Sequence, residues 1–314
     1  MASESIEVNS RGRRTSVSAI SVGEGANVVV EGRGLRMGRL HDEFWLPNGS
    51  IPSPEAIVRS LLATKRHPDI FTFAERLPAP GRTRDHHVEW ESLAVAQFHS
   101  YEDWFEKQVN RSVRKHVRKA EREGLVAQEA PFSESLISGI HDIYNEVPVR
   151  QGRPFWHYGK NLQQVQDDNA SYLERSTFIA ATFQGTVVGF LKMVTIEPGV
   201  AALMQILSSV AHSEKRPTNA LLAKAVEICA ARGTEQLVYG HYAYGTKDDS
   251  SLIEFKRNNA FNRVDVPRYF VPLTLRGRAG LSLGLHRPWR DKVPSKLRNA
   301  ISHARAKWHA INPA

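Results

Sequence analysis

The sequence predicts an α/β fold of the α+β kind, in which a mixed sheet is flanked by helices, with a smaller α/β unit at the N-terminus. Short apolar runs of strand length alternate with amphipathic runs of helix length between residues 93 and 275. The chain of 314 residues has room for about two domains. Hydrophobic residues make up 41% and charged residues 24%, the balance of a globular protein.

The smaller unit occupies residues 1–92. Its first 15 residues are polar and basic, and we expect a frayed tail. Apolar runs between residues 26 and 46 are separated by glycines and indicate short strands, while Ser53 before Pro54 marks a helix start. A strand is expected at residues 71–73. Strands alternating with a helix indicate an α/β unit.

The larger unit begins with a strand at residues 92–98 and a helix at residues 100–124. Apolar residues recur four apart in this helix, and Arg and Lys fill its other faces. We therefore expect an amphipathic, basic helix whose core side is formed by Phe105, Val109, Val113 and Val117. A second helix is expected at residues 134–145.

Three strands follow, at residues 177–182, 187–194 and 200–208, and Gln184-Gly185 between the first two is a hairpin signal. Next come a helix ending at Gly233, a strand, a helix at about residues 250–258, and a long strand. These are followed by a basic stretch that we expect to be helical. The expected domains are residues 1–92, 93–275 and 276–314.

The net charge of +9 favours anionic partners such as phosphates, nucleic acid or a membrane surface, although a solvated basic surface explains it equally well. Cys229 is the single cysteine, so no intramolecular disulfide can form. There is neither a signal-peptide pattern nor a run of about 18 apolar residues, and we expect a cytoplasmic protein without stable membrane insertion. No pattern indicates an oligomeric state.

Thirteen histidines raise the question of a metal site. His86 and His87 are adjacent, but no histidine pair has the His-x3-His helical spacing with an acidic third ligand. We therefore expect no metal. A serine nucleophile elbow, Gly-x-Ser-x-Gly, is also missing from the sequence.

Residues 251–261 read Ser-Leu-Ile-Glu-Phe-Lys-Arg-Asn-Asn-Ala-Phe and precede a strand. This segment and the order of elements resemble the GNAT superfamily of N-acetyltransferases. In that superfamily the helix after the fifth strand commonly ends in an aromatic residue, Lys or Arg, a polar residue, Gly and Phe. The matching residues are Phe255, Lys256, Asn259, Ala260 and Phe261, with Ala260 in place of the glycine.

Residues 111–125 read Arg-Ser-Val-Arg-Lys-His-Val-Arg-Lys-Ala-Glu-Arg-Glu-Gly-Leu. This segment is similar to the basic helix of Fem-type aminoacyltransferases, which build peptidoglycan cross-bridges from aminoacyl-tRNA and consist of paired GNAT-like folds. Residues 1–92 are then either a separate α/β unit or a degenerate second GNAT-like domain. The sequence departs from the superfamily at residues 212–219, His-Ser-Glu-Lys-Arg-Pro-Thr-Asn, where the pyrophosphate loop usually carries glycines.

The resemblance implies an N-acyltransferase. In such an enzyme an amine directly attacks an acyl or aminoacyl group carried by an activated donor, either acyl-CoA or aminoacyl-tRNA. The acceptor would be a small-molecule or peptide amine, and tRNA is a candidate partner. The rival function is a non-catalytic RNA-binding module on the same fold, which would grip phosphates with the basic helix and tail.

The donor site is expected around the loop before the helix at residues 219–231. Thr218 or Asn219 would cap that helix, whose exposed N–H groups attract anions, and Lys215 and Arg216 add positive charge. Alternatively, these residues are only a cap and two solvated bases. The expected donor-binding residues are Gln205, Ser208, Lys215, Arg216, Thr218 and Asn219.

The acceptor site is expected in residues 145–160, where polar side chains are dense among Pro and Gly. Arg150 and Arg153 flank a glycine, so a bent loop could aim both guanidinium groups at one acidic acceptor. An exposed connector is the alternative. The expected acceptor-binding residues are Arg150, Gln151, Arg153, His157, Tyr158 and Lys160.

Catalytic groups are expected where the fifth strand ends, because open α/β sheets bind ligands at the carboxyl ends of their strands. Tyr242 or Tyr244 would protonate the leaving group, and Glu146 or His241 would accept the proton of the amine.

Overall fold

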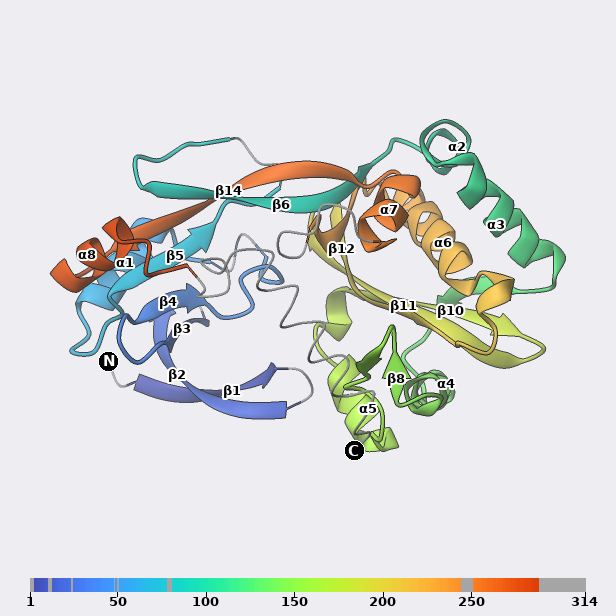
Figure 1. Cartoon of the computed structure of the whole chain (residues 1–314), viewed down its shortest axis with the longest axis horizontal. Helices are drawn as coiled ribbons and strands as arrows, with labels where there is room; N and C mark the ends of the chain where they lie inside the picture. The colour runs from blue at the N-terminus through green and yellow to red at the C-terminus, as the bar shows by residue number, and fades with distance from the viewer. Residues whose placement is uncertain are drawn as a thin grey trace. The chain divides into compact units, whose positions relative to one another are not determined.

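The structure is a computed structural model that describes residues 3–10, 13–23, 25–47, 49, 51–77, 81–243 and 251–287. The chain divides into two compact units (Figure 1), one of Met1–Glu91 with the segment from Asp265 onward, and one of Ser92–Val264. It passes between them within strands β6 (His87–Gln97) and β14 (Asn262–Pro272). The expected range of residues 93–275 differs from this division, because β14 carries the chain back into the first unit.

The first unit contains a sheet in the order β1-β2-β3-β4-β5-β14. Neighbouring strands are antiparallel except β4 and β5, which are parallel. The strands that precede β14 are β1 Ser3–Ser10, β2 Arg13–Gly23, β3 Ala26–Glu31, β4 Met37–Leu40 and β5 Ile70–Ala74.

The expected N-terminal tail is instead a strand pair. Ser3 lies opposite Ile20 and Ser10 opposite Arg13 along an antiparallel ladder, and Ile20 is buried. Polar composition suggested fraying, but a strand needs only alternate apolar positions, and partners on β2 supply its hydrogen bonds.

Two helices complete the described part of this unit. Helix α1 (Pro54–Leu62) has the expected cap, since Ser53 Oγ accepts a hydrogen bond of 3.2 Å from the Ala56 N–H, and it buries Ile57 and Leu61. Helix α8 (Leu275–Ser282) begins the segment that was expected to be a basic helical tail. Residues 288–314 of that segment lie outside the described residues.

The second unit contains a sheet in the order β6-β13-β12-β11-β10-β7. Its further strands are β7 Val126–Ala130, β10 Ser176–Phe183, β11 Thr186–Glu197, β12 Val200–Ser208 and β13 Gln236–His241. The turn Gln184-Gly185 joins β10 to β11 with φ angles of 50° and 79°, as a two-residue hairpin requires. The predicted hairpin is therefore confirmed, whereas β7 was not predicted.

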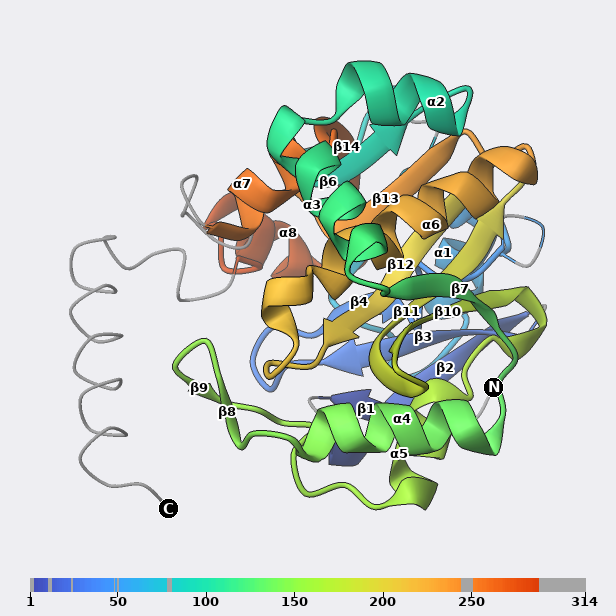
Figure 2. The same ribbon diagram turned by 90° about the vertical axis from the view of Figure 1, so that its right-hand side faces the viewer.

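Helices cover both faces of this sheet (Figure 2). Helices α3 (Arg111–Arg122) and α6 (Pro217–Ala231) lie on one face, and α4 (Glu134–Asn145) and α5 (Leu162–Asn169) lie on the other. Side chains along each strand alternate between two core clusters: Ile179 packs with α3 and α6, and its neighbour Phe178 packs with α4. The expected mixed sheet flanked by helices is confirmed.

The helix expected at residues 100–124 is interrupted. Helix α2 (Tyr101–Asp103) leads into a π-helical turn at Trp104–Gln108, and the chain is extended at Val109 and Asn110 before α3 begins. Asn110 causes the restart, because its side chain accepts a hydrogen bond from the Ser112 N–H, which suits a helix cap better than a helix interior. The predicted apolar side is confirmed, since Phe105, Val109, Val113 and Val117 are all buried.

Among the described residues, no helix is both long enough and apolar enough to cross a membrane.

Candidate functional site

The sheet of the second unit opens between β12 and β13. The two strands pair in parallel only from Val200–Ala202 opposite Gln236–Val238. Beyond Ala202, β12 continues along β11 as far as Ser208, whereas β13 continues along β6. Within the described residues, the second half of β12 therefore does not pair with β13. An open strand edge offers N–H and C=O groups to an extended ligand.

A β-bulge lies at the start of this opening. Lys192 lies opposite Gln205 while Met193 lies opposite Leu203, so Met204 is the extra residue of β12. A bulge reverses the alternation of side chains beyond it. Accordingly, Leu203 and Ile206 pack with the α3 and α6 core, although an unbroken strand would turn them to opposite faces. The bulge thereby turns Gln205 toward α4 and α5.

Gln205 belongs to a network of hydrogen-bonded polar side chains, the polar network, on the α4 and α5 face of the sheet. Its Oε1 accepts a hydrogen bond of 2.9 Å from the Tyr144 hydroxyl, and its Nε2 lies 3.1 Å from His157 Nε2. Asn169 Nδ2 donates to the Tyr144 hydroxyl at 3.4 Å, and Lys192 Nζ donates to the Asn169 carbonyl at 2.8 Å. The polar network lies within an otherwise apolar layer.

Burial shifts the pKa values of two groups in the polar network, His157 and Lys192. Burial, with Lys160 and Arg150 nearby, lowers the pKa of His157 to about 3, so its imidazole is neutral. Because the Gln205 amide donates to Nε2, the ring proton belongs on Nδ1, which is buried and has no hydrogen-bond partner in the described chain. Burial also lowers the pKa of Lys192 to about 8. An N–H without an acceptor indicates a place where a ligand could bond.

Glu146 at the end of α4 holds the loop after β12. Its carboxylate accepts hydrogen bonds of 2.7 Å from the Val210 N–H and 2.8 Å from the Ala211 N–H, and one of 2.8 Å from Ser209 Oγ. Burial acts to raise the pKa of Glu146, but these hydrogen bonds and Arg150 outweigh it and lower the pKa. The carboxylate is thus both less basic than usual and already bonded.

The backbone of this loop is directed inward. Besides the two N–H groups on Glu146, the N–H groups of Ser209, His212 and Ser213 donate to the Val188 carbonyl, Ser209 Oγ and the Val210 carbonyl, respectively. Five successive N–H groups at residues 209–213 therefore have acceptors within the chain. A loop that cradles phosphate needs such groups to be free for the ligand.

The expected helix caps are wrong. Helix α6 begins at Pro217, and its N-cap is Arg216, with a φ of 60° and no side-chain cap. Proline is favoured at the first helical position, which starts the helix before Thr218 and Asn219. The Thr218 hydroxyl lies 2.9 Å from Ser208 Oγ, and Asn219 is buried.

The two cations expected at the donor have different surroundings. Lys215 Nζ lies 4.2 Å from the centre of the Phe183 ring and 3.6 Å from a carboxylate oxygen of Glu123. It is thus engaged with neighbouring elements. Arg216 is exposed.

The expected joint orientation of Arg150 and Arg153 is not found. Arg150 turns inward, donates to the carbonyls of Ser208 and Ile143 at 2.8 and 2.7 Å, and lies over the Phe155 ring. Arg153 is exposed across a short hairpin formed by β8 (Val149–Arg150) and β9 (Arg153–Pro154), with Gln151 in its turn. These hydrogen bonds to two backbone carbonyls hold its guanidinium inside.

The remaining acceptor residues lie after this hairpin. Lys160 forms an ion pair with Asp168 and lies over the Trp156 ring. Tyr158 and Trp156 are exposed by about half of their surface. The sequence analysis did not identify Trp156. It also did not identify the buried residues Tyr144, Asn169 and Lys192, because in sequence they occupy ordinary positions of a helix or strand.

Tyr242 lies just beyond β13. Its N–H donates to the Ser92 carbonyl at 2.7 Å, and its half-buried side chain packs on the α3 and α6 core. The adjacent His241 carbonyl accepts a hydrogen bond of 2.5 Å from Lys256 Nζ, and burial lowers the pKa of Lys256 to about 8. Tyr244 lies outside the described residues.

The helix α7 (Ser251–Asn258) carries the motif with the altered glycine. Ala260 follows it with a φ of 60°, a left-handed conformation that glycine adopts readily. The backbone at Ala260 thus has the left-handed conformation that the glycine usual at this position of the GNAT pattern would favour.

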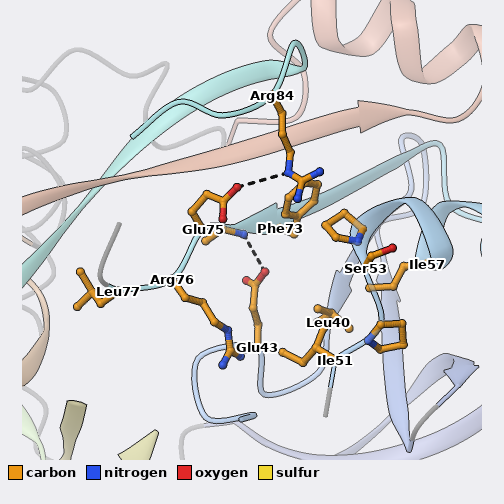
Figure 3. A pocket seen from close by; sticks show the side chains of 13 residues that line it. Leu40, Glu43, Ile51, Ser53, Ile57, Phe73, Glu75, Arg76, Leu77 and Arg84 are labelled. Atoms are coloured by element: carbon orange, nitrogen blue, oxygen red, sulfur yellow. Dashed lines mark hydrogen bonds and ion pairs between the residues drawn. The ribbon is translucent and has the colours of Figure 1, made fainter. Parts of the chain in front are cut away.

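The first unit also contains a cavity of about 350 Å³ (Figure 3) with an apolar floor that includes Ile57 and Phe73. Charged side chains that line it already have partners: Arg84 Nε lies 3.4 Å from a Glu75 oxygen. Glu43 accepts a hydrogen bond from the Ala74 N–H and pairs at 2.9 Å with Arg268, which lies outside the lining. These existing pairs make the cavity a weaker candidate than the opening in the second unit.

The splayed mixed sheet with helices on both faces (Figure 2) agrees with the fold class that the sequence predicted. The sequence matches no protein-family model and none of the curated proteins. Among solved structures, the chain is similar to FemX, with 8% identity over 89% of this chain and 90% of that chain and a TM-score of 0.58.

Two further structures are similar. L-PGS from Bacillus licheniformis has 13% identity over 81% of this chain and 83% of that chain, with a TM-score of 0.54. The C-terminal domain of an Agrobacterium fabrum protein provisionally assigned as a lysylphosphatidylglycerol synthetase has 11% identity over 85% and 87%, with a TM-score of 0.55. At these identities the likeness shows the fold, and its coverage extends over both units.

Proposed function

We propose that this protein is an acyltransferase, in which an amine directly attacks the carbonyl of an activated donor bound at the opening between β12 and β13. The observation that carries the proposal is the end of pairing at Ala202 and Val238, which leaves the edge of β12 open in the middle of a sheet. The opening adjoins both the polar network at Gln205 and the half-buried Tyr242.

The open backbone of β12 suits acyl transfer. A backbone N–H can donate to the donor carbonyl as negative charge develops on its oxygen during attack. Holding donor and amine side by side supplies much of the remaining acceleration. We assign the protonation of the leaving group to Tyr242 or Tyr244.

Glu146 is less suited to the role of general base than the sequence predicted. Its pKa is lowered and both oxygens accept hydrogen bonds from the loop, while the pKa of His157 is lowered to about 3. We therefore propose that the amine enters in its neutral form, and that the proton it loses as the amide forms replaces the one that the tyrosine gives to the leaving group. The buried Nδ1–H of His157 would instead orient an oxygen of the acceptor.

We favour aminoacyl-tRNA over acyl-CoA as the donor. The loop that would hold a pyrophosphate has its N–H groups at residues 209–213 already bonded. Arg111, Lys115 and Arg122 are exposed on α3 and could contact tRNA phosphates. One structural neighbour is named for lysylphosphatidylglycerol, which contains an amino acid group. The acceptor would be a small-molecule or peptide amine.

Transfer of label tests the proposal. The full-length protein is incubated with a mixed pool of radiolabelled aminoacyl-tRNA, or with labelled acetyl-CoA, and a lysine-containing peptide. Aminoacyl transfer would move label from tRNA to the peptide as an amide, which resists mild alkali that cleaves the tRNA ester. Tyr242→Phe should lower kcat more than it changes KM, and Tyr239→Phe on the preceding strand β13 is the matched control.

The other outcomes separate the alternatives. Label transferred only from acetyl-CoA would overturn the choice of donor but keep the acyltransferase. Salt-sensitive tRNA binding with the ester label intact would favour the non-catalytic RNA-binding module instead. If neither donor loses label to any amine in a panel, the proposed activity fails.

A further inference from the structure

Three possible metal ligands meet in the first unit. His87 and Glu89 lie two residues apart on β6, so their side chains point to the same face of the strand. His286 comes from the segment after α8. Glu89 Oε1 lies 2.8 Å from His286 Nε2 and 3.7 Å from His87 Nε2, and all three ligand atoms lie within 4.8 Å of one another.

We propose that His87, Glu89 and His286 bind a divalent transition-metal cation of the zinc type. Two imidazole nitrogens and one carboxylate oxygen form a common zinc ligand set, with a fourth position left for water. Ligands at about 2.0–2.1 Å in tetrahedral geometry lie roughly 3.3–3.5 Å apart, within the range that these atoms already span. Since the His87 side chain is 39% exposed, it has room to turn toward a cation.

The surroundings of His286 give the cluster a rigid side. Its side chain is only 1% exposed, and its ring packs against Phe270 with centroids 4.8 Å apart. Packing therefore holds the ring in place before any cation binds, with Nε2 directed at Glu89.

Arg287 is the competing group. Its Nε donates to the same Glu89 Oε1 at 2.7 Å, and its side chain is 54% exposed. A cation bound to that oxygen would displace this hydrogen bond and would be repelled by the guanidinium. Removing the guanidinium should therefore strengthen metal binding.

Metal titration of the full-length protein tests the site. Zn²⁺ binding is measured by calorimetry, and Co²⁺ binding by the visible absorption bands of a tetrahedral site. We expect one tight site, weakened at least tenfold in His87→Asn and in Glu89→Gln. His86→Asn is the matched control and should bind as the wild type does. Binding should weaken as the pH falls below the histidine range, because protons compete for the nitrogens.

Arg287→Gln provides a test that loss of folding cannot imitate, because affinity should rise by roughly threefold or more when a neighbouring positive charge is removed. Zn²⁺ bound equally well by the wild type and by His87→Asn/Glu89→Gln would overturn the site, as would the lack of any saturable binding. The readout is the metal itself, so a failure here is distinguishable from a failure of the proposed acyl transfer.

Discussion

Replacing Glu146 with Gln should destabilise the second unit. The wild-type carboxylate receives two hydrogen bonds on Oε1, from Ser209 and Ala211, and two on Oε2, from the Val210 N–H at 2.7 Å and Arg150 at 3.4 Å. Gln keeps one accepting oxygen and places an NH₂ group against the donors on the other side. Losing the two hydrogen bonds on that side and weakening the others should cost about 2–4 kcal/mol.

Urea denaturation followed by circular dichroism measures this cost. Asp142→Asn on the same helix is the control, because its side chain is 71% exposed and the change should fall within about 0.5 kcal/mol. The lowered pKa of Glu146 determines the pH dependence. Its stabilisation is fully present above the unfolded pKa of about 4.3 and is lost as the pH falls through the lower folded value.

The difference between wild type and Glu146→Gln should therefore be constant near neutral pH and should shrink in acid. A Gln variant as stable as the wild type at neutral pH, but without activity, would refute this reasoning. It would restore Glu146 as the general base.

Two further substitutions test local features of the fold. Ala260→Gly should stabilise the protein by about 0.5–1 kcal/mol. Glycine removes the strain of a left-handed alanine, which is roughly 1–2 kcal/mol, and this gain exceeds the loss from the greater entropy of the unfolded chain. An unchanged or lower melting temperature would contradict this prediction. Arg114→Glu should cost about 2–3 kcal/mol, because Arg114 donates to the Phe105 and Glu106 carbonyls of the π-helical turn and, at 2.8 Å, to the Val109 carbonyl that follows the turn. The exposed Lys115→Glu should stay within about 0.5 kcal/mol. Equal effects of these two charge reversals in urea denaturation would count against a structural role for Arg114.

Elements were predicted well where local signals agreed. Helix α4 matches its expected range at both ends, because Ser133 caps it and Pro148 follows it closely. Strand β12 also matches its expected range. In contrast, β7 has a burial pattern without clear alternation, and its place in the sheet comes from pairing with β10. A strand determined by its partner leaves little signal in its own residues.

The candidate site was predicted as a set of residues more than as a set of roles. Glu146 was identified, but its partners at Val210 and Ala211 are more than 60 residues away in sequence, so its role in holding the loop was invisible. The same holds for Arg150, whose acceptor at the Ser208 carbonyl lies 58 residues away. A metal site was not expected, because only the helical spacing of histidines was considered, whereas His87 and Glu89 have the two-residue spacing of a strand.

The bulge at Met204 explains why alternation along β12 could not predict the site. Without the extra residue, Gln205 would face α6, and neither the Tyr144 hydroxyl nor His157 Nε2 would have its present partner. A methionine carries no bulge signal, whereas a glycine in a strand often does. Ile206, the residue after Gln205, points to the other face of the sheet. There it packs with the α3 and α6 core, which also contacts Tyr242. One inserted residue therefore places Gln205 on the polar side of the opening and Ile206 on its apolar side, as the proposed acyl-transfer site requires.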